Sequence, residues 1–459
     1  MLNRRSFFGA TTGLVAAGMA TPRTAGAAEL SGIRTASIRG SIDATELGLI
    51  PGAFDDQSKA FANMLRKASD TDMPVFMPPG VYVVSNLTLP RRVRLTGVPG
   101  ATRIVYGGDG HLFLAETSEL VHLTGITFDG ANRWIGDHAQ GLLDFRRLPE
   151  LAIDACRIIG SGKNALALER VGGRIERTVI SGAADAGIYT VEGSRLAILA
   201  NTVSDCANGG ILVHRWQAAD DGTIVSGNRV ERIAARNGGT GQFGNGINLF
   251  RANNVMVSNN VISDCAFSAI RANSASNFQA QGNSCVRSGE TAIYTEFAFE
   301  GSIISGNIVD VAANGISMVN FNEGGRMVVC SGNLVRNLSL QGPYPADAPG
   351  FGVGITAEAD CAITGNVIEN APRYGMHLGW GAFMRNLVAT GNVVREARTG
   401  IAVSVVDGAG SAVVSDNIID GTPNGAVVGY EWTKPVTGDL AVDGAGDHVN
   451  LVVERNRVS

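Results

Sequence analysis

The sequence is poor in charged residues and contains no run of basic ones. Charged residues make up 17% of the chain, the formal net charge is −5, and Lys and Arg never occur more than two in a row. Nucleic-acid-binding proteins carry basic patches, so we expect no nucleic-acid partner. A disordered chain needs high charge and low hydrophobicity, and the 45% hydrophobic content excludes it.

Proline and aromatic residues are also scarce, with 14 prolines and 6% aromatics against 60 glycines. Small turn residues spread evenly through an apolar chain favour many short strands joined by tight turns. The cysteines show neither CxxC pairs nor metal-type spacing, so we interpret them as small buried hydrophobic residues and expect neither a metal nor a cofactor. They are Cys156, Cys206, Cys265, Cys285, Cys330 and Cys361.

No apolar run is long enough for a stable membrane span. Residues 1–27 instead show the pattern of an export signal: NRRSFF, the short apolar stretch GATTGLVAAGMA, and a small-x-small cleavage site at Ala25-Gly26-Ala27. The Arg4-Arg5 pair resembles a twin-arginine signal, with an ordinary secretory signal as the alternative. We therefore expect the twin-arginine export machinery as a partner, a periplasmic or secreted location, and no stable membrane span after cleavage.

One repeat recurs from Leu151 to the C-terminus: two apolar residues, a turn with Asn, two apolar residues, a polar stretch, then Gly-Ile. Segments such as VSGNRV, VSNNVI and ISGNIV return at gaps of mostly 23 to 27 residues. The apolar runs are too short for helices, and no single repeat can bury its own inner face, so the repeats must stack. The pattern predicts an all-β parallel solenoid of about a dozen coils, each built from three short strands.

The recurring Asn has a structural meaning in such a solenoid. Asn tolerates the left-handed conformation that a sharp turn needs, and stacked Asn side chains can hydrogen-bond along the axis. We therefore interpret this column as structural rather than catalytic. Its members are Asn201, Asn228, Asn260, Asn283, Asn307, Asn333, Asn366, Asn392, Asn417 and Asn456.

The part of the chain before the repeats predicts a helical cap. Residues 54–68, FDDQSKAFANMLRKA, have the periodicity of a helix, with Asp55, Asp56 and Ser58 as cap and first-turn residues. Such a helix would close the open end of the solenoid. We expect residues 28–459 to form one domain, with the first coils in 75–150 and the regular repeats in 151–459. The predicted apolar face of the helix is Ala60, Phe61, Met64, Leu65 and Ala68.

Three segments carry a family resemblance. AFDDQSKAFANMLRKA, VFMPPGVYVV and LTGVPGATRIV resemble the N-terminal region of the pectin-lyase-like superfamily. The repeats that follow are similar to those of bacterial polysaccharide-modifying enzymes. Together with NRRSFF, the chain resembles the twin-arginine-translocated repetitive proteins of bacteria. The resemblance implies a right-handed, single-stranded parallel β-helix and a polysaccharide partner. It supplies no catalytic residue, because the sequence has neither the NTD…DD…HG…RIK set of polygalacturonases nor the DPHE motif of mannuronan epimerases.

The alternation of the Gly-Ile strands predicts a surface stripe. If the Ile points inward, the first and third residues after it point outward, one pair in each coil. We expect these pairs to form one polar and aromatic face, which fades towards Ala402, Ser404 and Val427. The pairs are Tyr189/Val191, Leu212/His214, Asn248/Phe250, Arg271/Asn273, Tyr294/Glu296, Ser317/Val319, Thr356/Glu358 and His377/Gly379.

Such a stripe suits a sugar chain, because aromatic rings cover apolar sugar faces while Asn, Arg and Glu bind hydroxyl groups. A merely solvated face is the alternative. Two long coils, ERIAARNGGTGQFGNGI and RNLSLQGPYPADAPGFGVGI, should place loops at the edge of this face, and long loops are uncommon without a role. The predicted substrate-binding residues are Tyr189, Asn248, Phe250, Asn273, Asn320, His377 and Trp380.

Two chemistries fit the stripe. In a lyase or epimerase, Arg271 would neutralise a uronate carboxylate, and Tyr294 or His214 would remove the adjacent proton. In a hydrolase, Glu296 and Glu358 would act as the carboxyl pair, two coils or about 10 Å apart, with Asn320 near the gap. We therefore expect an exported protein that binds and processes a polysaccharide, with elimination or epimerisation ahead of hydrolysis. The alternative is a non-catalytic solenoid of the cell envelope that binds glycan or protein.

Overall fold

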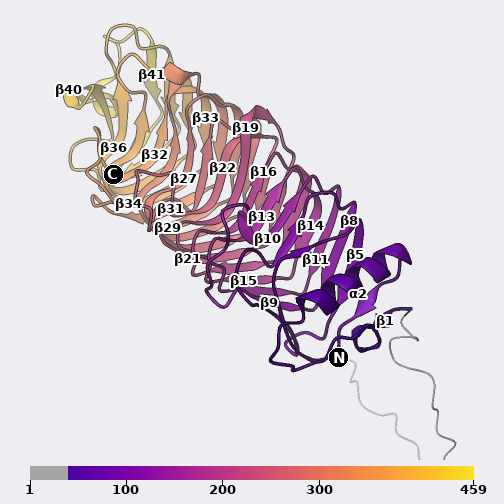
Figure 1. The fold of residues 1–459 in the computed structure, drawn as a ribbon. Coiled ribbons are helices and arrows are strands. Elements are labelled where there is room, and N and C mark those ends of the chain that lie inside the picture. The colour runs from indigo at the N-terminus through magenta and orange to yellow at the C-terminus, as the bar shows by residue number, and fades with distance from the viewer. Residues whose placement is uncertain (1–39) are drawn as a thin grey trace, which may run out of the picture.

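A computed structural model describes residues 40–459. It shows an all-β, right-handed parallel solenoid of about 14 turns, close to the dozen coils predicted from the repeat. Figure 1 shows the coils following one another along a single axis, from α2 at one end to β41 at the other. The predicted export signal, residues 1–27, lies outside the described residues.

One wall of the solenoid is a parallel sheet of 16 strands, in which each strand pairs with those of the coils before and after it. Its strands are β1 (Ile42–Asp43), β2 (Val75–Phe76), β5 (Arg92–Thr96), β8 (Leu120–Thr124), β11 (Glu150–Asp154), β14 (Gly172–Glu176), β17 (Ser194–Leu199), β20 (Ile224–Ser226), β23 (Met256–Ser258), β26 (Phe278–Gln281), β28 (Glu300–Ser305), β30 (Arg326–Ser331), β33 (Ala359–Thr364), β35 (Arg385–Thr390), β37 (Ala412–Ser415) and β41 (Leu451–Glu454).

The other two walls belong to a sheet of 26 strands, in which several strands run through both walls without a break. The wall that follows the Asn turn contains β3 (Gly80–Val84), β6 (Thr102–Tyr106), β9 (Thr127–Asp129), β12 (Arg157–Ile159), β15 (Val179–Ser181), β18 (Thr202–Ser204), β21 (Arg229–Ile233), β24 (Val261–Cys265), β31 (Leu334–Leu338), β38 (Ile418–Asp420) and β42 (Arg457–Val458). The wall that carries the Gly-Ile positions contains β4 (Leu87–Thr88), β7 (Phe113–Ala115), β10 (Gly141–Arg146), β13 (Asn164–Glu169), β16 (Ala186–Val191), β19 (Gly209–Asp220), β22 (Asn245–Asn253), β25 (Ile270–Asn273), β32 (Val353–Ala357) and β39 (Val427–Glu431). Both walls share β27 (Ser284–Glu296), β29 (Ile308–Met318), β34 (Val367–Leu378) and β36 (Val393–Ser404).

The inner face of each coil is aliphatic and fully covered. Ile247, Ile270, Ile293 and Ile316 occupy one register position in successive coils, and each is 0 or 1% exposed. Because every coil pairs with its neighbours in register, identical positions in the repeat become vertical rows in the core. The six cysteines lie in this interior, all of them buried, as the sequence indicated.

The Asn column is continuous from Asn201 to Asn456. At each step, both the backbone N–H and the side-chain amide of one Asn donate to the Oδ1 of the Asn in the next coil, for example from Asn260 to Asn283 at 3.0 Å each. The side-chain amide of Asn283 also donates to the carbonyl of Val257 at 3.0 Å. The column therefore satisfies buried backbone groups at the turn in coil after coil.

One detail of the predicted turn is wrong. The left-handed residue is the one before the column Asn, such as Gly282 (φ 64°) or Asn259 (φ 55°), and no column Asn has a positive φ. The preceding residue makes the bend, whereas the column Asn must keep an ordinary φ so that its side chain points inward along the axis.

The N-terminal end is closed by a helix, as predicted. The helix α2 spans Ser58–Asp70 rather than 54–68, because Gln57 holds the N-cap position while the Asp56 carboxylate accepts the backbone N–H of Ser58 at 2.8 Å. Phe61 is buried and meets the ring of Phe113 in the first coils at 5.9 Å. Met64, Leu65 and Ala68 are buried on the same face.

Irregular elements complete the fold. They are the 3-10 turns η1 (Ala44–Leu47) and η2 (Phe321–Glu323), the short helix α3 (Leu440–Asp443), and β40 (Lys434–Asp439), which pairs antiparallel with β39. Among residues 40–459, no helix is both long and apolar enough to cross a membrane.

Replacing Asn283 by Ala should destabilise the solenoid. The change leaves the buried backbone N–H of Asn260 and the carbonyl of Val257 without their partners, and each such loss costs about 1–3 kcal/mol. We expect chemical denaturation to show a loss of about 3 kcal/mol in the free energy of unfolding. Asn424→Ala, at an exposed position with an ordinary φ, is the matched control; equal stability of the two variants would contradict the structural role of the column.

Candidate functional site

The predicted stripe lies on one face of the solenoid. The register joins Tyr189 to Leu212, Asn248, Arg271, Tyr294, Ser317, Thr356 and His377 in successive coils. The second row runs from Val191 through His214, Phe250 and Asn273 to Glu296. One predicted member is misplaced: Val427 pairs with Ile401 and points into the core, because the outward residue of that coil is Val428.

An ion-pair cluster occupies the middle of the stripe. The Arg271 Nε donates to Glu296 Oε1 at 2.7 Å, and its Nη1 lies 3.6 Å from Glu290 Oε2. The guanidinium also lies over the ring of Tyr294, 5.2 Å from its centroid. Asn273 donates to the same Glu296 oxygen at 3.0 Å, and the Tyr344 hydroxyl donates to Glu290. Arg271, Tyr294, Asn273 and Glu296 are thus brought together as predicted, joined by Glu290 and Tyr344.

This cluster weighs against the elimination chemistry. The side chains of Arg271, Glu296 and Glu290 are 11, 3 and 1% exposed, so the charge of Arg271 is already compensated by two covered carboxylates. Burial beside Glu296 moves the pKa of Tyr294 far above its usual value, so the phenol is a poor base. A guanidinium held in this way has little capacity left to neutralise a uronate carboxylate.

The other predicted base, His214, lies in an aromatic row. Its ring meets Tyr189 at 5.4 Å and Phe250 at 5.7 Å, both edge-on. Burial lowers the pKa of His214 to about 4, so the ring is neutral at pH 7. The part of the stripe around Tyr189, His214 and Phe250 therefore offers apolar and neutral polar surface rather than charge.

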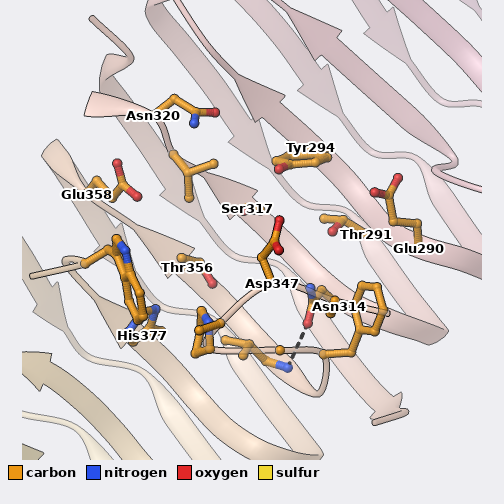
Figure 2. Close-up of a pocket in the computed structure, with 18 of the residues that line it drawn as sticks. Glu290, Thr291, Tyr294, Asn314, Ser317, Asn320, Asp347, Thr356, Glu358 and His377 are labelled. Atoms are coloured by element: carbon orange, nitrogen blue, oxygen red, sulfur yellow. Dashed lines mark hydrogen bonds between the residues drawn. The ribbon is translucent and has the colours of Figure 1, made fainter. Parts of the chain in front are cut away.

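A cavity of about 300 Å³ lies beside the cluster, on its C-terminal side. The floor is formed by Tyr294, Ser317 and Thr356 of the stripe, and the loop between β31 and β32 covers it with Tyr344 and Asp347. In Figure 2, Glu358 and Glu290 lie on opposite sides of this cavity, with Asp347 between them. The long loop predicted to flank the stripe thus forms part of the wall.

Glu358 carries a buried carboxyl group that forms no ion pair within the described residues. It is 8% exposed, its Oε2 accepts the backbone N–H of Phe321 at 2.7 Å, and no ion pair within residues 40–459 involves it. Burial raises the pKa of Glu358 to about 7, although hydrogen bonds from the backbone of Phe321 and Asn320 oppose the rise. A carboxyl group with this pKa is half protonated at neutral pH and can donate a proton.

The remaining predicted residues border the same cavity. Asn320 lies in the wall, where its Oδ1 accepts the backbone N–H of Phe297 at 3.1 Å. His377 is 3% exposed, and its ring stacks on Tyr374 at 5.5 Å. Burial lowers the pKa of His377 to about 4. Trp380 stands edge-on to His377 at 6.0 Å and to Trp432 at 5.3 Å, which extends the aromatic surface beyond the cavity.

Two predicted groupings are not brought together. Glu296 is tied to Arg271 and does not line the cavity that contains Glu358, so the two do not face each other as a carboxyl pair. Tyr189 lies several coils away from the cavity. The repeat pattern gives no signal for Glu290, whereas Tyr344 and Asp347 lie in one of the two unusually long coils, and that length is the sequence feature that pointed towards them. Within residues 40–459, no three His, Cys, Asp or Glu side chains are arranged to hold a metal ion.

Comparisons with known proteins support the fold. A family model described as "Right handed beta helix region" matches residues 237–386. No curated protein matches the sequence. Gene product 12 of bacteriophage phi29, in its pre-mature form, is 16% identical over 90% of this chain and 58% of its own length, with a TM-score of 0.51.

Two enzymes are among the other similar structures. The catalytic unit of a thermostable GH87 α-1,3-glucanase from Streptomyces thermodiastaticus strain HF3-3 is 15% identical over 92% of this chain and 69% of its own, with a TM-score of 0.47. The A-module of a mannuronan C-5 epimerase from Azotobacter vinelandii is 12% identical over 91% of this chain and 100% of its own, with a TM-score of 0.39. At such identities the likeness concerns the fold alone.

The raised pKa of Glu358 should make stability depend on pH. The folded protein holds a proton on this group between its unfolded value of 4.5 and about 7, so folding becomes less favourable as pH rises through that window. Relative to Glu358→Gln, we expect the wild-type free energy of unfolding to fall by about 3 kcal/mol between pH 4.5 and 7.5. Urea denaturation at several pH values measures the difference, and parallel curves for the two proteins would refute the assignment.

Proposed function

We propose that the protein binds a polysaccharide along the stripe and hydrolyses it in the cavity beside Glu358. The observation that carries the proposal is the covered, cation-free carboxyl of Glu358 facing a cavity that also contains the carboxylate of Asp347. Glycoside hydrolysis requires two carboxyl groups in different environments, one protonated and one ionised. Asp347 lies on the exposed loop that covers this cavity, whereas Glu358 lies buried on its floor side, so the two carboxyl groups have different environments.

The roles follow from these environments. Glu358 donates its proton to the leaving glycosidic oxygen as the bond to the anomeric carbon breaks. A water molecule attacks that carbon and loses its proton to Asp347, so that one water is added across the bond and both carboxyl groups exchange protonation states. Elimination is disfavoured because Arg271 is already compensated by Glu296 and Glu290.

The sugar chain has a supporting surface on both sides of this site. Tyr294 lies on the N-terminal side, while His377 and Trp380 lie on the C-terminal side, and all three line the cavity. Aromatic rings provide faces for the apolar sides of sugar rings, and Ser317 and Thr356 provide hydroxyl groups between them. A chain lying along the solenoid axis would contact all of these residues.

Replacing Glu358 by Gln should abolish hydrolysis while leaving binding intact. Gln keeps the size and the acceptor oxygen but cannot donate a carboxyl proton, and loss of a general acid costs about 100- to 10,000-fold in rate. Reducing-sugar release from a panel of polysaccharides measures activity, and affinity electrophoresis measures binding.

The matched control is Glu369→Gln, in the wall of the Asn turn. It should retain full activity, and the wild-type rate should fall above about pH 7, where Glu358 loses its proton. If Glu358→Gln retains wild-type turnover, the proposed mechanism is wrong. If the wild type binds glycan but never releases reducing ends, the protein is a binding solenoid.

We also propose that the chain is exported through the twin-arginine pathway to the periplasm or beyond. The Arg4-Arg5 pair within NRRSFF supports this. Replacing both arginines by Lys should keep the protein in the cytoplasm, as fractionation and immunoblotting would show. Continued export of the Arg4→Lys, Arg5→Lys variant would instead indicate an ordinary secretory signal.

A further inference from the structure

A second cavity, of about 350 Å³, lies on the same stripe on the N-terminal side of the Arg271 cluster. Asn248 and Arg271 form its floor in neighbouring coils, His214 and Phe250 form one side, and the loop Thr240–Gln242 forms the other. This loop belongs to the first of the two long coils singled out in the sequence. Neither the acid–base chemistry of Glu358 nor the aromatic surface around Trp380 uses this cavity.

Three polar atoms of this cavity lack a hydrogen-bond partner within the described part of the chain. They are Asn248 Oδ1, His214 Nε2 and Arg271 Nη1, and all three are covered from solvent. The contact of Arg271 Nη1 with Glu290 Oε2, at 3.6 Å, is an ion pair too long to be a hydrogen bond. Asn248 as a whole is only 6% exposed. An unpaired buried polar atom costs about 1–3 kcal/mol, so three of them on three successive coils indicate groups that a ligand completes.

The loop is fitted closely to the guanidinium. Gly241 has a φ of 134°, and a Cβ at this position would lie 1.4 Å from Arg271 Nη1. A residue with a Cβ would be strained at this φ and would displace the guanidinium, so glycine suits the loop where it passes over Arg271. The loop, the guanidinium and the strand residues thus hold one another in place around the cavity.

The unpaired atoms specify the chemistry of the ligand. Asn248 Oδ1 requires a donor, whereas Arg271 Nη1 requires an acceptor, and a hydroxyl group can serve both. A carboxylate cannot donate to Asn248, and it would meet the negative charge of Glu296 and Glu290, which already compensate Arg271. Phe250 adds an apolar wall suited to the face of a sugar ring.

We propose that this cavity is a subsite for a neutral, hydroxyl-rich sugar ring of the polysaccharide, so that the substrate is a neutral glycan rather than a polyuronate. The inference rests on the proposed function, since it names the class of polysaccharide that binds along the same stripe. Asn248 and Thr356 are separated by four coil steps, or about 19 Å. The subsite therefore holds the chain several sugar units from the bond that is cleaved.

Matched oligosaccharides test the substrate class. Isothermal titration with the full-length Glu358→Gln protein would compare glucan, mannan and galactan hexasaccharides with glucuronan, mannuronan and galacturonan hexasaccharides. We expect at least one neutral hexasaccharide to bind, and its uronate counterpart to bind at least tenfold more weakly. Preference for a uronate, or failure of every neutral hexasaccharide to bind, overturns the inference.

Replacing Asn248 by Leu tests the subsite itself. The variant should bind the preferred neutral hexasaccharide at least tenfold more weakly, whereas Asn337→Ala, on an exposed side chain of another wall, should bind it like the parent. Because Asn248 Oδ1 has no hydrogen-bond partner among residues 40–459, Leu should not lower the thermal midpoint. Asn248→Ala provides a second variant with no added bulk. Undiminished binding by both variants refutes the subsite.

The experiments distinguish failure of the proposed hydrolase function from failure of the proposed subsite. The hydrolase function is tested by the loss of turnover in Glu358→Gln. The subsite is tested by the affinity for oligosaccharide, measured in that inactive variant. If the protein binds neutral glycan through Asn248 but does not cleave it, the subsite is supported and the hydrolase function is refuted. A protein that cleaves glycan with unchanged affinity in Asn248→Leu keeps the hydrolase and loses the subsite.

Discussion

The vertical hydrogen bonds between successive coils are the constraint on which the rest of the molecule depends. Each Asn of the column satisfies a buried backbone N–H of the neighbouring coil, and the strands on either side pair in parallel register. With the register fixed, a residue's place in the repeat determines whether it faces the core or the solvent, and which residues lie above and below it. Isoleucines stack into the core, and the residues that follow them become one continuous outer face. The stripe, with the two cavities along it, is a consequence of this stacking.

Within that face, two glutamates that lie two coils apart have opposite environments. Glu296 lies against Arg271 and Asn273, so its negative charge is compensated and its Oε1 accepts two hydrogen bonds. Glu358, two coils further on, accepts hydrogen bonds only from backbone N–H groups within the described residues, and burial favours its protonated form. The ion-pair cluster of Arg271, Glu296 and Glu290 forms the boundary between the two cavities, so the cavities also differ in their charge environment. One cavity is suited to acid–base chemistry, and the other is suited to holding a neutral ring.

The sequence predicts those features that depend on local periodicity. The inward Ile247 and Ile270, the Asn column, and the alignment of Asn248, Arg271 and Tyr294 all follow from a repeat and the alternation of a strand. What it does not reveal depends on contacts between distant segments. Tyr344 reaches Glu290 from 54 residues away, so neither the compensation of Arg271 nor the place of Asp347 has a local signal. The start of α2 at Ser58 was missed because Gln57, a weak capping residue, holds the N-cap.

A crystal structure of the Glu358→Gln protein with a bound neutral oligosaccharide tests the central claim most directly, namely that the coil register builds one groove for a sugar chain. The account predicts a chain running along the solenoid axis, with one ring beside Asn248 and Arg271 and a glycosidic oxygen next to residue 358. An oligosaccharide bound on another wall, or lying across the strands away from both cavities, would contradict it.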